Sequence, residues 1–341
     1  MHSRRWSPTG SARDSDPEAD VRPWGVEDRQ PVPQDPVELD ADRRVARRRN
    51  YDMRRLSYAG TFTNPWKAGT IRTIEWMTAK VTLMRLIRSF ERQGAPFGPP
   101  FWPAAIRHMG IEIGTPPEEI LRIPKDGPLV VVANHPHGLV DGMVMAELIN
   151  RVRSDFKILT RSLLTGIPEV AQFMIPVPFP HEENARELGL QMRNEAMAHL
   201  KAGGVIILFP AGKVASSPGL FGPAVEPDWN PFSHKMIMRS GAAVLPIRFT
   251  GQNTRAYQIA NRLSATLRQS LLLYEIKKAL NKPQRPYIGH AIPPDVLRRW
   301  ADNPRGFLGW LRAHTLALGT AAETPVPDFS LTLGTPGRAA R

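Results

Sequence analysis

Apolar and polar positions follow two distinct patterns between about residue 125 and residue 320. Short runs that are apolar throughout and rich in β-branched residues are typical of strands buried on both faces of a sheet. Such runs predict strands at residues 128–133, 156–159, 205–209, 243–249 and 287–292. Segments with an apolar residue every three or four positions predict helices at residues 141–152, 185–201, 254–280 and 304–320. This alternation predicts an α/β fold with a mixed, largely parallel sheet flanked by helices.

A further helix is predicted over residues 70–92, before this domain. Its apolar side chains recur at helical spacing: Ile71, Ile74, Met77, Val81, Met84 and Ile87. Its other side is basic: Arg72, Lys80, Arg85, Arg88 and Arg92. A basic amphipathic helix either lies in a membrane interface or packs on the domain, and both interpretations stay open. The prolines that follow predict an extended or turning linker: Pro96, Pro99, Pro100 and Pro103.

The two ends of the chain lack apolar periodicity. Residues 1–50 are rich in Pro, Asp, Arg and Gln, which predicts a disordered tail. Residues 322–341 are rich in Pro, Gly and Ala, which predicts a flexible tail. Between these tails we expect a helical segment at 51–104, which is a candidate for membrane docking. We expect one folded domain at 105–321.

Composition and charge narrow the possible functions. The 341 residues include no Cys, which excludes disulfides, thiolate zinc sites and a cysteine nucleophile. The formal net charge is +13. In residues 1–50 the charges cancel, so the excess lies on the rest of the chain and favours polyanionic partners. Residues 1–20 lack the apolar stretch of a signal peptide, and no run approaches the roughly 18–20 apolar residues of a membrane span. We expect no transmembrane helix.

The most informative stretch, Asn134 to Asp141, reads N-H-P-H-G-L-V-D and lies where a predicted strand gives way to a helix. Ligands bind at the carboxyl ends of strands in open α/β sheets, so a catalytic site is expected here. A metal site with a His-x-His pair would need further ligands, but residues 139 and 140 are Leu and Val. A serine hydrolase would need a Gly-x-Ser-x-Gly elbow, which the sequence lacks.

A histidine–aspartate dyad is the third chemistry that fits. Asp141 would hold one histidine in the tautomer that acts as a general base. Either His135 or His137 is close enough in sequence to be that base. Such a dyad needs no protein nucleophile if the substrate brings its own hydroxyl.

The Asn-His, short loop and Asp pattern resembles the first motif of the glycerolipid acyltransferases of the PlsC type. That family's commonest spacing puts four residues between His and Asp, whereas His135 and Asp141 are separated by five. The form that begins N-H-P resembles a branch with this extra residue, and His137 matches the family less well. The His-Pro-His-Gly stretch is also similar to diacylglycerol acyltransferases.

Other segments resemble that family's later blocks, over roughly residues 125–295. Residues 209–216, F-P-A-G-K-V-A-S, resemble the third block, and residues 244–247, V-L-P-I, resemble the fourth. Residues 157–170 stand where the family recognises its acceptor, and Arg161 is their best anion ligand. Two departures are present: Ala211 replaces the family's usual Glu, and the Gly-x-x-Phe-x-x-Arg block is missing.

The resemblance implies an O-acyltransferase that moves a fatty acyl group from acyl-CoA or acyl carrier protein to the hydroxyl of a lyso-lipid. It implies His135 as the base, Asp141 as its partner, and no metal or cofactor. The acceptor would be 1-acylglycerol-3-phosphate or a related lysophospholipid, with a lyso-ornithine lipid or a neutral lipid as the alternative. Backbone N–H groups near Gly138 or Gly212 would hold the oxyanion. The implied substrate-binding residues are Asn134, His137, Gly138, Arg161, Phe209, Pro210, Gly212, Lys213 and Ser216.

Because its substrates are lipids, we expect such an enzyme to bind peripherally to an anionic membrane surface on the cytoplasmic face. Two rival functions belong to other classes. Nucleic-acid binding is suggested by the basic charge, but no aromatic-rich RNA motif, zinc finger or helix-turn-helix is evident. A lipid-surface scaffold without turnover is suggested by Ala211, whereas the intact His135 and Asp141 argue against it.

Overall fold

The computed structural model describes residues 57, 59, 64–160, 167–178, 184–219 and 222–324. Contacts divide the chain into two units, Met1–Arg44 and Val45–Arg341, and the described residues all belong to the second. The predicted tail at 1–50, Arg161 and most of the predicted tail at 322–341 lie outside the described residues.

A six-stranded sheet forms the centre of the described unit, with the order β3-β2-β4-β1-β5-β6. The strands are β1 (Leu129–Ala133), β2 (Phe156–Thr160), β3 (Met174–Pro176), β4 (Val205–Leu208), β5 (Ala243–Arg248) and β6 (Tyr287–Ile288). The first five of these pair in parallel, and β6 pairs antiparallel with β5. The predicted α/β fold with a largely parallel sheet is therefore confirmed, with β3 as a strand that the apolar pattern did not predict.

Strand β1 lies between β4 and β5, and this placement positions the site. Val130 lies beside Ile206 of β4 and Val244 of β5. Because the three strands are parallel, their carboxyl ends reach the same edge of the sheet. The segments that follow Ala133, Leu208 and Arg248 therefore converge there.

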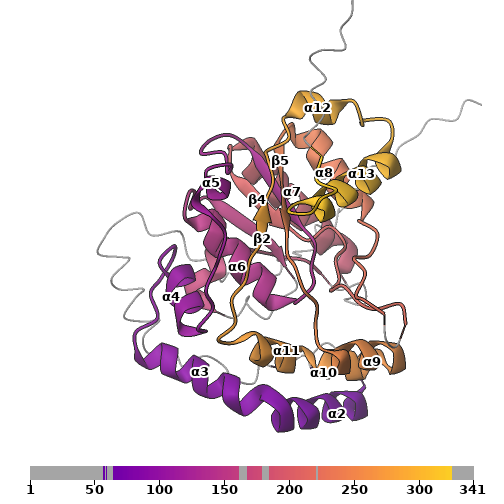
Figure 1. Ribbon diagram of the computed structural model, residues 1–341. Coiled ribbons are helices and arrows are strands. Elements are labelled where there is room, and N and C mark those ends of the chain that lie inside the picture. The colour runs from indigo at the N-terminus through magenta and orange to yellow at the C-terminus, as the bar shows by residue number, and fades with distance from the viewer. Residues whose placement is uncertain are drawn as a thin grey trace, which may run out of the picture. The chain divides into compact units, whose positions relative to one another are not determined.

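Helices cover both faces of this sheet (Figure 1). The side chains of β1 alternate between two apolar clusters, as they must in a strand buried on both sides. One cluster joins the sheet to α4 (Phe101–His108), α6 (Leu139–Asn150) and α11 (Leu272–Ala279). The other joins it to α7 (Ala185–Lys201), α8 (Pro231–Ser240), α12 (Pro294–Arg298) and α13 (Pro304–Ala317). Two further short elements are α5 (Pro117–Ile120) and the 3₁₀ helix η3 (Pro168–Phe173).

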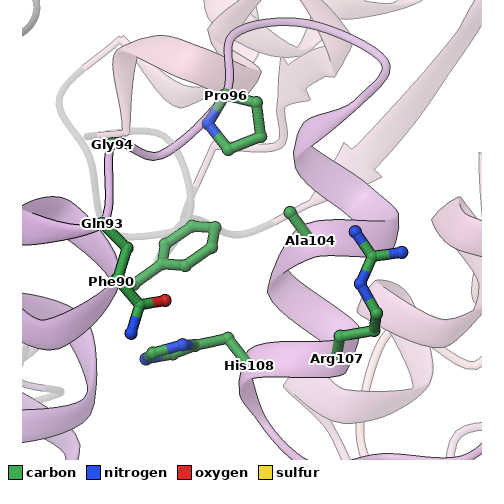
Figure 2. Close-up of a pocket in the computed structure, with 7 residues that line it drawn as sticks. All are labelled: Phe90, Gln93, Gly94, Pro96, Ala104, Arg107 and His108. Carbon is green, nitrogen blue, oxygen red and sulfur yellow. The ribbon is translucent and has the colours of Figure 1, made fainter.

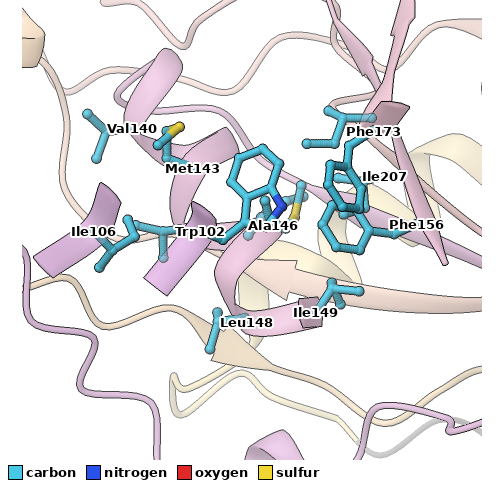
Figure 3. Packing of buried hydrophobic residues seen from close by; sticks show 14 of the residues in the cluster. Trp102, Ile106, Val140, Met143, Ala146, Leu148, Ile149, Phe156, Phe173 and Ile207 are labelled. Atoms are coloured by element: carbon cyan, nitrogen blue, oxygen red, sulfur yellow. The ribbon is translucent and has the colours of Figure 1, made fainter. Parts of the chain in front are cut away.

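Trp102 anchors α4 to the sheet. It is fully buried, and its ring centroid lies 5.8 Å from that of Phe156 and 5.6 Å from that of Phe173 (Figure 3). The predicted linker after residue 92 is thus wrong in part, because its last proline, Pro103, lies inside a helix. Proline is tolerated there because the first turn needs no backbone N–H. Pro100 precedes that turn as the N-cap.

A second layer of helices lies beside the sheet domain (Figure 1). It contains α2 (Pro65–Glu75), the π-helix η2 (Trp76–Lys80) and α3 (Val81–Arg92). These pack on α10 (Ala265–Ser270) and α11, and α9 (Arg255–Leu263) adjoins α10. The predicted helix at 70–92 is confirmed but begins at Pro65, whereas the helix predicted at 254–280 is three shorter helices.

The apolar stripe predicted on residues 70–92 is divided in the structure. Ile71 is fully buried, whereas Met77 is 74% exposed. The buried face is made instead by Ala68, Ile71, Ala79 and Leu83. The π-turn at η2 shifts the helical phase, so positions with regular spacing no longer share one face. Among the described residues, no helix is both long enough and apolar enough to cross a bilayer.

Candidate active site

The loop between β1 and α6 brings both candidate histidines to the start of a helix. Gly138 caps α6 with φ at +82°, a conformation that glycine adopts without strain. Asp141 lies at the third position of α6, where its Oδ2 accepts the backbone N–H groups of His137 (2.8 Å) and Gly138 (3.1 Å). A carboxylate in the first turn also interacts favourably with the helix dipole. The acid is therefore fixed by the same contacts that begin the helix.

Asp141 binds both histidines. Nδ1 of His135 lies 3.0 Å from its Oδ2, and Nδ1 of His137 lies 3.0 Å from its Oδ1. The carboxylate is fully buried, while the two imidazoles are 17% and 16% exposed. The sequence left open whether His135 or His137 pairs with Asp141, and the structure contains both contacts. Each histidine donates through Nδ1, which leaves its Nε2 as the basic nitrogen.

The charge state of Asp141 follows from these contacts. Burial acts to raise its pKa, but the charge of His137 and the hydrogen bonds from both histidines outweigh burial and lower the pKa to about 2. Burial likewise acts to lower the pKa of His137, and the Asp141 carboxylate, with a smaller contribution from Glu275, reverses this and raises it. The site is thus a buried anion held between two imidazoles.

Surroundings distinguish the two histidines. Nε2 of His137 faces the backbone of Gly251, so closely that a Cβ atom at Gly251 would lie 2.9 Å from it. The imidazole of His135 instead stacks on Phe209, with centroids 3.8 Å apart and planes 24° from parallel. In the described part of the chain, no residue forms a hydrogen bond to Nε2 of His135. This nitrogen is the better placed of the two to meet a substrate.

The block after β4 supports His135 and contains exposed residues beyond it. The backbone N–H of Ala215 donates to the carbonyl of His135 (2.8 Å), and the buried Pro210 accepts from Asn230. Gly212 and Lys213 are exposed, and Ser216 is half-buried on a bridge to Val225. Phe209 is thus the predicted substrate-binding residue of this block whose side chain lies against a dyad side chain.

Asn134 joins two strand ends. Its amide Nδ2 donates to the carbonyl of Phe249 (2.8 Å), and its Oδ1 accepts the N–H of the same residue (2.7 Å). Asn134 is 6% exposed. These contacts give it a positioning role between β1 and β5 beside His135, in addition to the substrate-binding role that the sequence suggested.

Glu226 belongs to the site and was not singled out from the sequence. Its Oε2 accepts the backbone N–H of His135 (3.1 Å), and its Oε1 accepts Nε1–H of Trp229 (3.2 Å). Arg312 of α13 donates to its carbonyl, and the residue is 5% exposed. Burial raises the pKa of this carboxyl. The only sequence signal would have been an acid in an apolar, proline-containing segment.

The backbone N–H groups of Gly138 and Gly212 themselves already donate hydrogen bonds within the protein. The N–H of Gly138 donates to Asp141, and the N–H of Gly212 donates to the carbonyl of Phe209 (2.9 Å). A substrate oxyanion would have to compete with these contacts. An oxyanion donor near Gly138 or Gly212 stays a prediction.

A separate cleft of about 340 Å³ lies between the end of α3 and α4 (Figure 2). Phe90, Ala104 and Arg107 are among its lining residues, and none of the predicted site residues is. His108 borders it and bonds the carbonyl of Leu86, which ties α4 to α3. The described residues contain no group of three or more His, Cys, Asp or Glu arranged to hold a metal ion.

Comparison with known proteins gives a match to a family model and a likeness to solved structures. Residues 118–250 match the family model described as acyltransferase, a span that includes the dyad and the block after β4. The fold is similar to the crystal structure of the 1-acyl-sn-glycerophosphate (LPA) acyltransferase PlsC from Thermotoga maritima, with a TM-score of 0.42 and 17% sequence identity. That match covers 75% of this chain and 83% of the other. No curated protein matches the chain significantly.

Proposed function

We propose that the protein moves a fatty acyl group from an acyl thioester to the hydroxyl of a lyso-lipid, and the proposal starts from the match of residues 118–250 to the acyltransferase family model. The observation that carries the proposal is the contact between Nδ1 of His135 and the buried Asp141 carboxylate. This contact fixes the tautomer in which Nε2 accepts a proton.

The reaction follows from that tautomer. Nε2 of His135 takes the proton of the acceptor hydroxyl as its oxygen attacks the thioester carbonyl carbon, and a tetrahedral oxyanion forms. When the oxyanion collapses, the carbon–sulfur bond breaks and the thiolate takes the proton back from the imidazolium. Asp141 stabilises the imidazolium between these steps. A positioned general base contributes about 10²–10⁴ in rate.

The acceptor we propose is 1-acylglycerol-3-phosphate or a related lysophospholipid, and the donor is acyl-CoA or acyl carrier protein. The net charge of +13 and the exposed Lys213 at the edge of the sheet favour anionic substrates. Ala211, in the place of the family's usual Glu, favours a lysophospholipid or a lyso-ornithine lipid over a simple phosphomonoester acceptor, whereas the His-Pro-His-Gly stretch suggests a neutral lipid as the alternative. Arg161 remains a predicted headgroup ligand.

We place the enzyme at the cytoplasmic face of a membrane as a peripheral protein. Trp66, Trp76 and Met77 are exposed by 86%, 65% and 74%, on α2 and η2. Large apolar side chains flanked by exposed Arg and Lys are typical of helices that lie in a membrane interface. Ile71 is buried with Ala59 and Ala68, and α2 packs on α10, so docking and packing use different faces.

A thioester-release assay tests the proposal. The purified full chain is given acyl-CoA or acyl carrier protein together with a panel of lyso-lipids, and the acylated product is identified by mass spectrometry. The proposal expects thiol release that depends on a lyso-lipid and yields one acylated lipid for each thiol released. Vesicle binding without acceptor-dependent release would instead identify a scaffold, and RNA binding without release would identify a nucleic-acid-binding protein.

A further inference from the structure

Helix α9 borders the site through its buried face. Its Gln258 accepts the N–H of Ser217 (2.7 Å), in the loop that follows the block after β4. Its N-cap, Thr254, donates to the buried Glu275, whose charge acts on His137. The chain enters α9 from Gly251, the residue that lies against His137. The helix is therefore hydrogen-bonded to the loop that follows the block beside His135, and the chain joins it to the turn that lies against His137.

The outer face of α9 is apolar and basic. Ile259 and Leu263 are exposed by 37% and 69%, and the neighbouring Arg255 and Arg262 are exposed as well. Positions four residues apart share one side of a helix, so Arg255, Ile259 and Leu263 form a stripe. A leucine so exposed beside arginines is typical of a helix that lies in an interface between water and apolar material.

The charge of the helices around α9 indicates what kind of surface this face of the protein binds. The only acids in the sequences of α2, η2, α9, α10 and α11 are Glu75 and Glu275. Both are buried, and each accepts a hydrogen bond, Glu75 from Ser57 and Glu275 from Thr254. The exposed charges of these helices are basic: Lys67, Arg72, Arg255, Arg262 and Lys278. This combination is complementary to an anionic lipid leaflet, where each basic residue adds attraction that salt screens.

We propose that the outer face of α9, made by Arg255, Ile259, Arg262 and Leu263, inserts into an anionic leaflet and seats the mouth of the His135 site against it. A lyso-lipid would then pass from the leaflet to the dyad without its chain crossing water. This rests on the proposed acyl transfer to a lipid. It adds a lipid contact separate from Trp66, Trp76 and Met77, at the rim of the active site.

Two matched variants test the contact. Leu263→Asp changes the proposed surface, and Leu190→Asp changes another exposed leucine, 55% exposed, on α7. Helix α7 packs on the face of the sheet opposite α11. Binding is measured by co-sedimentation with vesicles of phosphatidylglycerol and phosphatidylcholine in equal amounts. We expect Leu263→Asp to weaken binding by about tenfold or more, because a leucine side chain leaves the apolar phase and a like charge faces the lipid. We expect Leu190→Asp to bind as the wild type does.

Activity separates this inference from the function on which it rests. Turnover of a long-chain lyso-lipid in vesicles should fall for Leu263→Asp, whereas turnover of a short-chain analogue that dissolves as single molecules should match that of Leu190→Asp. Equal vesicle binding by the two variants would overturn the inference while leaving acyl transfer standing. Failure of the wild type to acylate either substrate would overturn the proposed function, and the binding comparison would still decide whether α9 contacts lipid.

Discussion

The ring of Phe209 stacks on the imidazole of His135, with their centroids 3.8 Å apart. The two residues follow different strands, β4 and β1, which pair side by side in the sheet. The stack restrains the imidazole on its flat side, and Asp141 restrains it at Nδ1. The orientation of Nε2 is therefore fixed in two directions before any substrate binds.

Phe209→Leu should lower kcat by about two- to tenfold, because an aromatic pair is worth about 0.5–1.5 kcal/mol beyond the area it buries. The substitution keeps an apolar side chain but removes the flat surface. Phe209→Tyr keeps the ring and should retain most of the activity. Steady-state kinetics on the three proteins provide the check, and a leucine variant as fast as the wild type would show that the stack does not orient the base.

Glu226→Ala should lower kcat by about tenfold or more, since it removes a charged acceptor from the backbone N–H of His135. Trp229→Phe is the matched control, because it removes the other donor to Glu226 and leaves the contact with His135. Both variants should lose stability, which thermal melting measures. Only the first should lose turnover in the folded protein, and equal turnover losses would assign Glu226 a purely structural role.

The free energy of unfolding should fall by about 2 kcal/mol as the pH drops from about 4 to about 2, because of Asp141. Its pKa is lowered from 3.8 to about 2 in the folded protein, so its stabilisation is present above the unfolded value and is lost as the pH falls through the folded one. Denaturant unfolding at several pH values measures this. Asp141→Asn lacks the carboxylate, so its free energy of unfolding should depend less on pH in this window, and an unchanged slope would contradict the buried ion pair.

The pKa of His137 is raised, so this residue stabilises the folded protein at low pH and loses its contribution as the pH rises above 6.5.

Two substitutions on α2 and η2 should separate packing from docking. Ile71→Asp places a charge in a fully buried position and should lower the free energy of unfolding by several kcal/mol. Met77→Asp changes a side chain that is 74% exposed, so stability should stay within about 0.5 kcal/mol while binding to anionic vesicles weakens. Arg85→Glu with Arg88→Glu should weaken binding further, and high salt should do the same to the wild type. If binding to anionic vesicles does not depend on salt and Met77→Asp leaves it unchanged, this helix does not dock on the membrane.

Sequence patterns were sufficient for five of the six strands and for the loop that holds His135, His137 and Asp141. A strand that is apolar throughout must be buried on both faces, and such strands imply helices on both sides. The Asn134–Asp141 stretch lies at a strand–helix junction, and this alone brings His135 and Asp141 to one loop. These two residues are only six positions apart, so a local sequence pattern is enough to predict that they lie close together.

Contacts between residues far apart in the sequence could not be predicted from those patterns. Glu226 approaches His135 across 91 residues, and its backbone is held by Arg312 from α13. No periodicity records such a pairing. The break of the segment 254–280 into three helices was also missed, because α9 and α11 each bury apolar residues at helical spacing, Tyr257 and Ala260 on the first and Leu273 and Ile276 on the second. Pro103 was read as a helix breaker, although the first turn of a helix accepts proline.

The most direct test of the account compares His135→Ala with His137→Ala in the acyl-transfer assay, with thermal melting to confirm that both variants fold. Asp141 contacts both histidines, but only His135 has Phe209 against its ring and Glu226 on its backbone N–H. We predict that His135→Ala lowers turnover by about 100-fold or more, and that His137→Ala lowers it less. Wild-type turnover by folded His135→Ala, or a larger loss in His137→Ala, would contradict the assignment of His135 as the base.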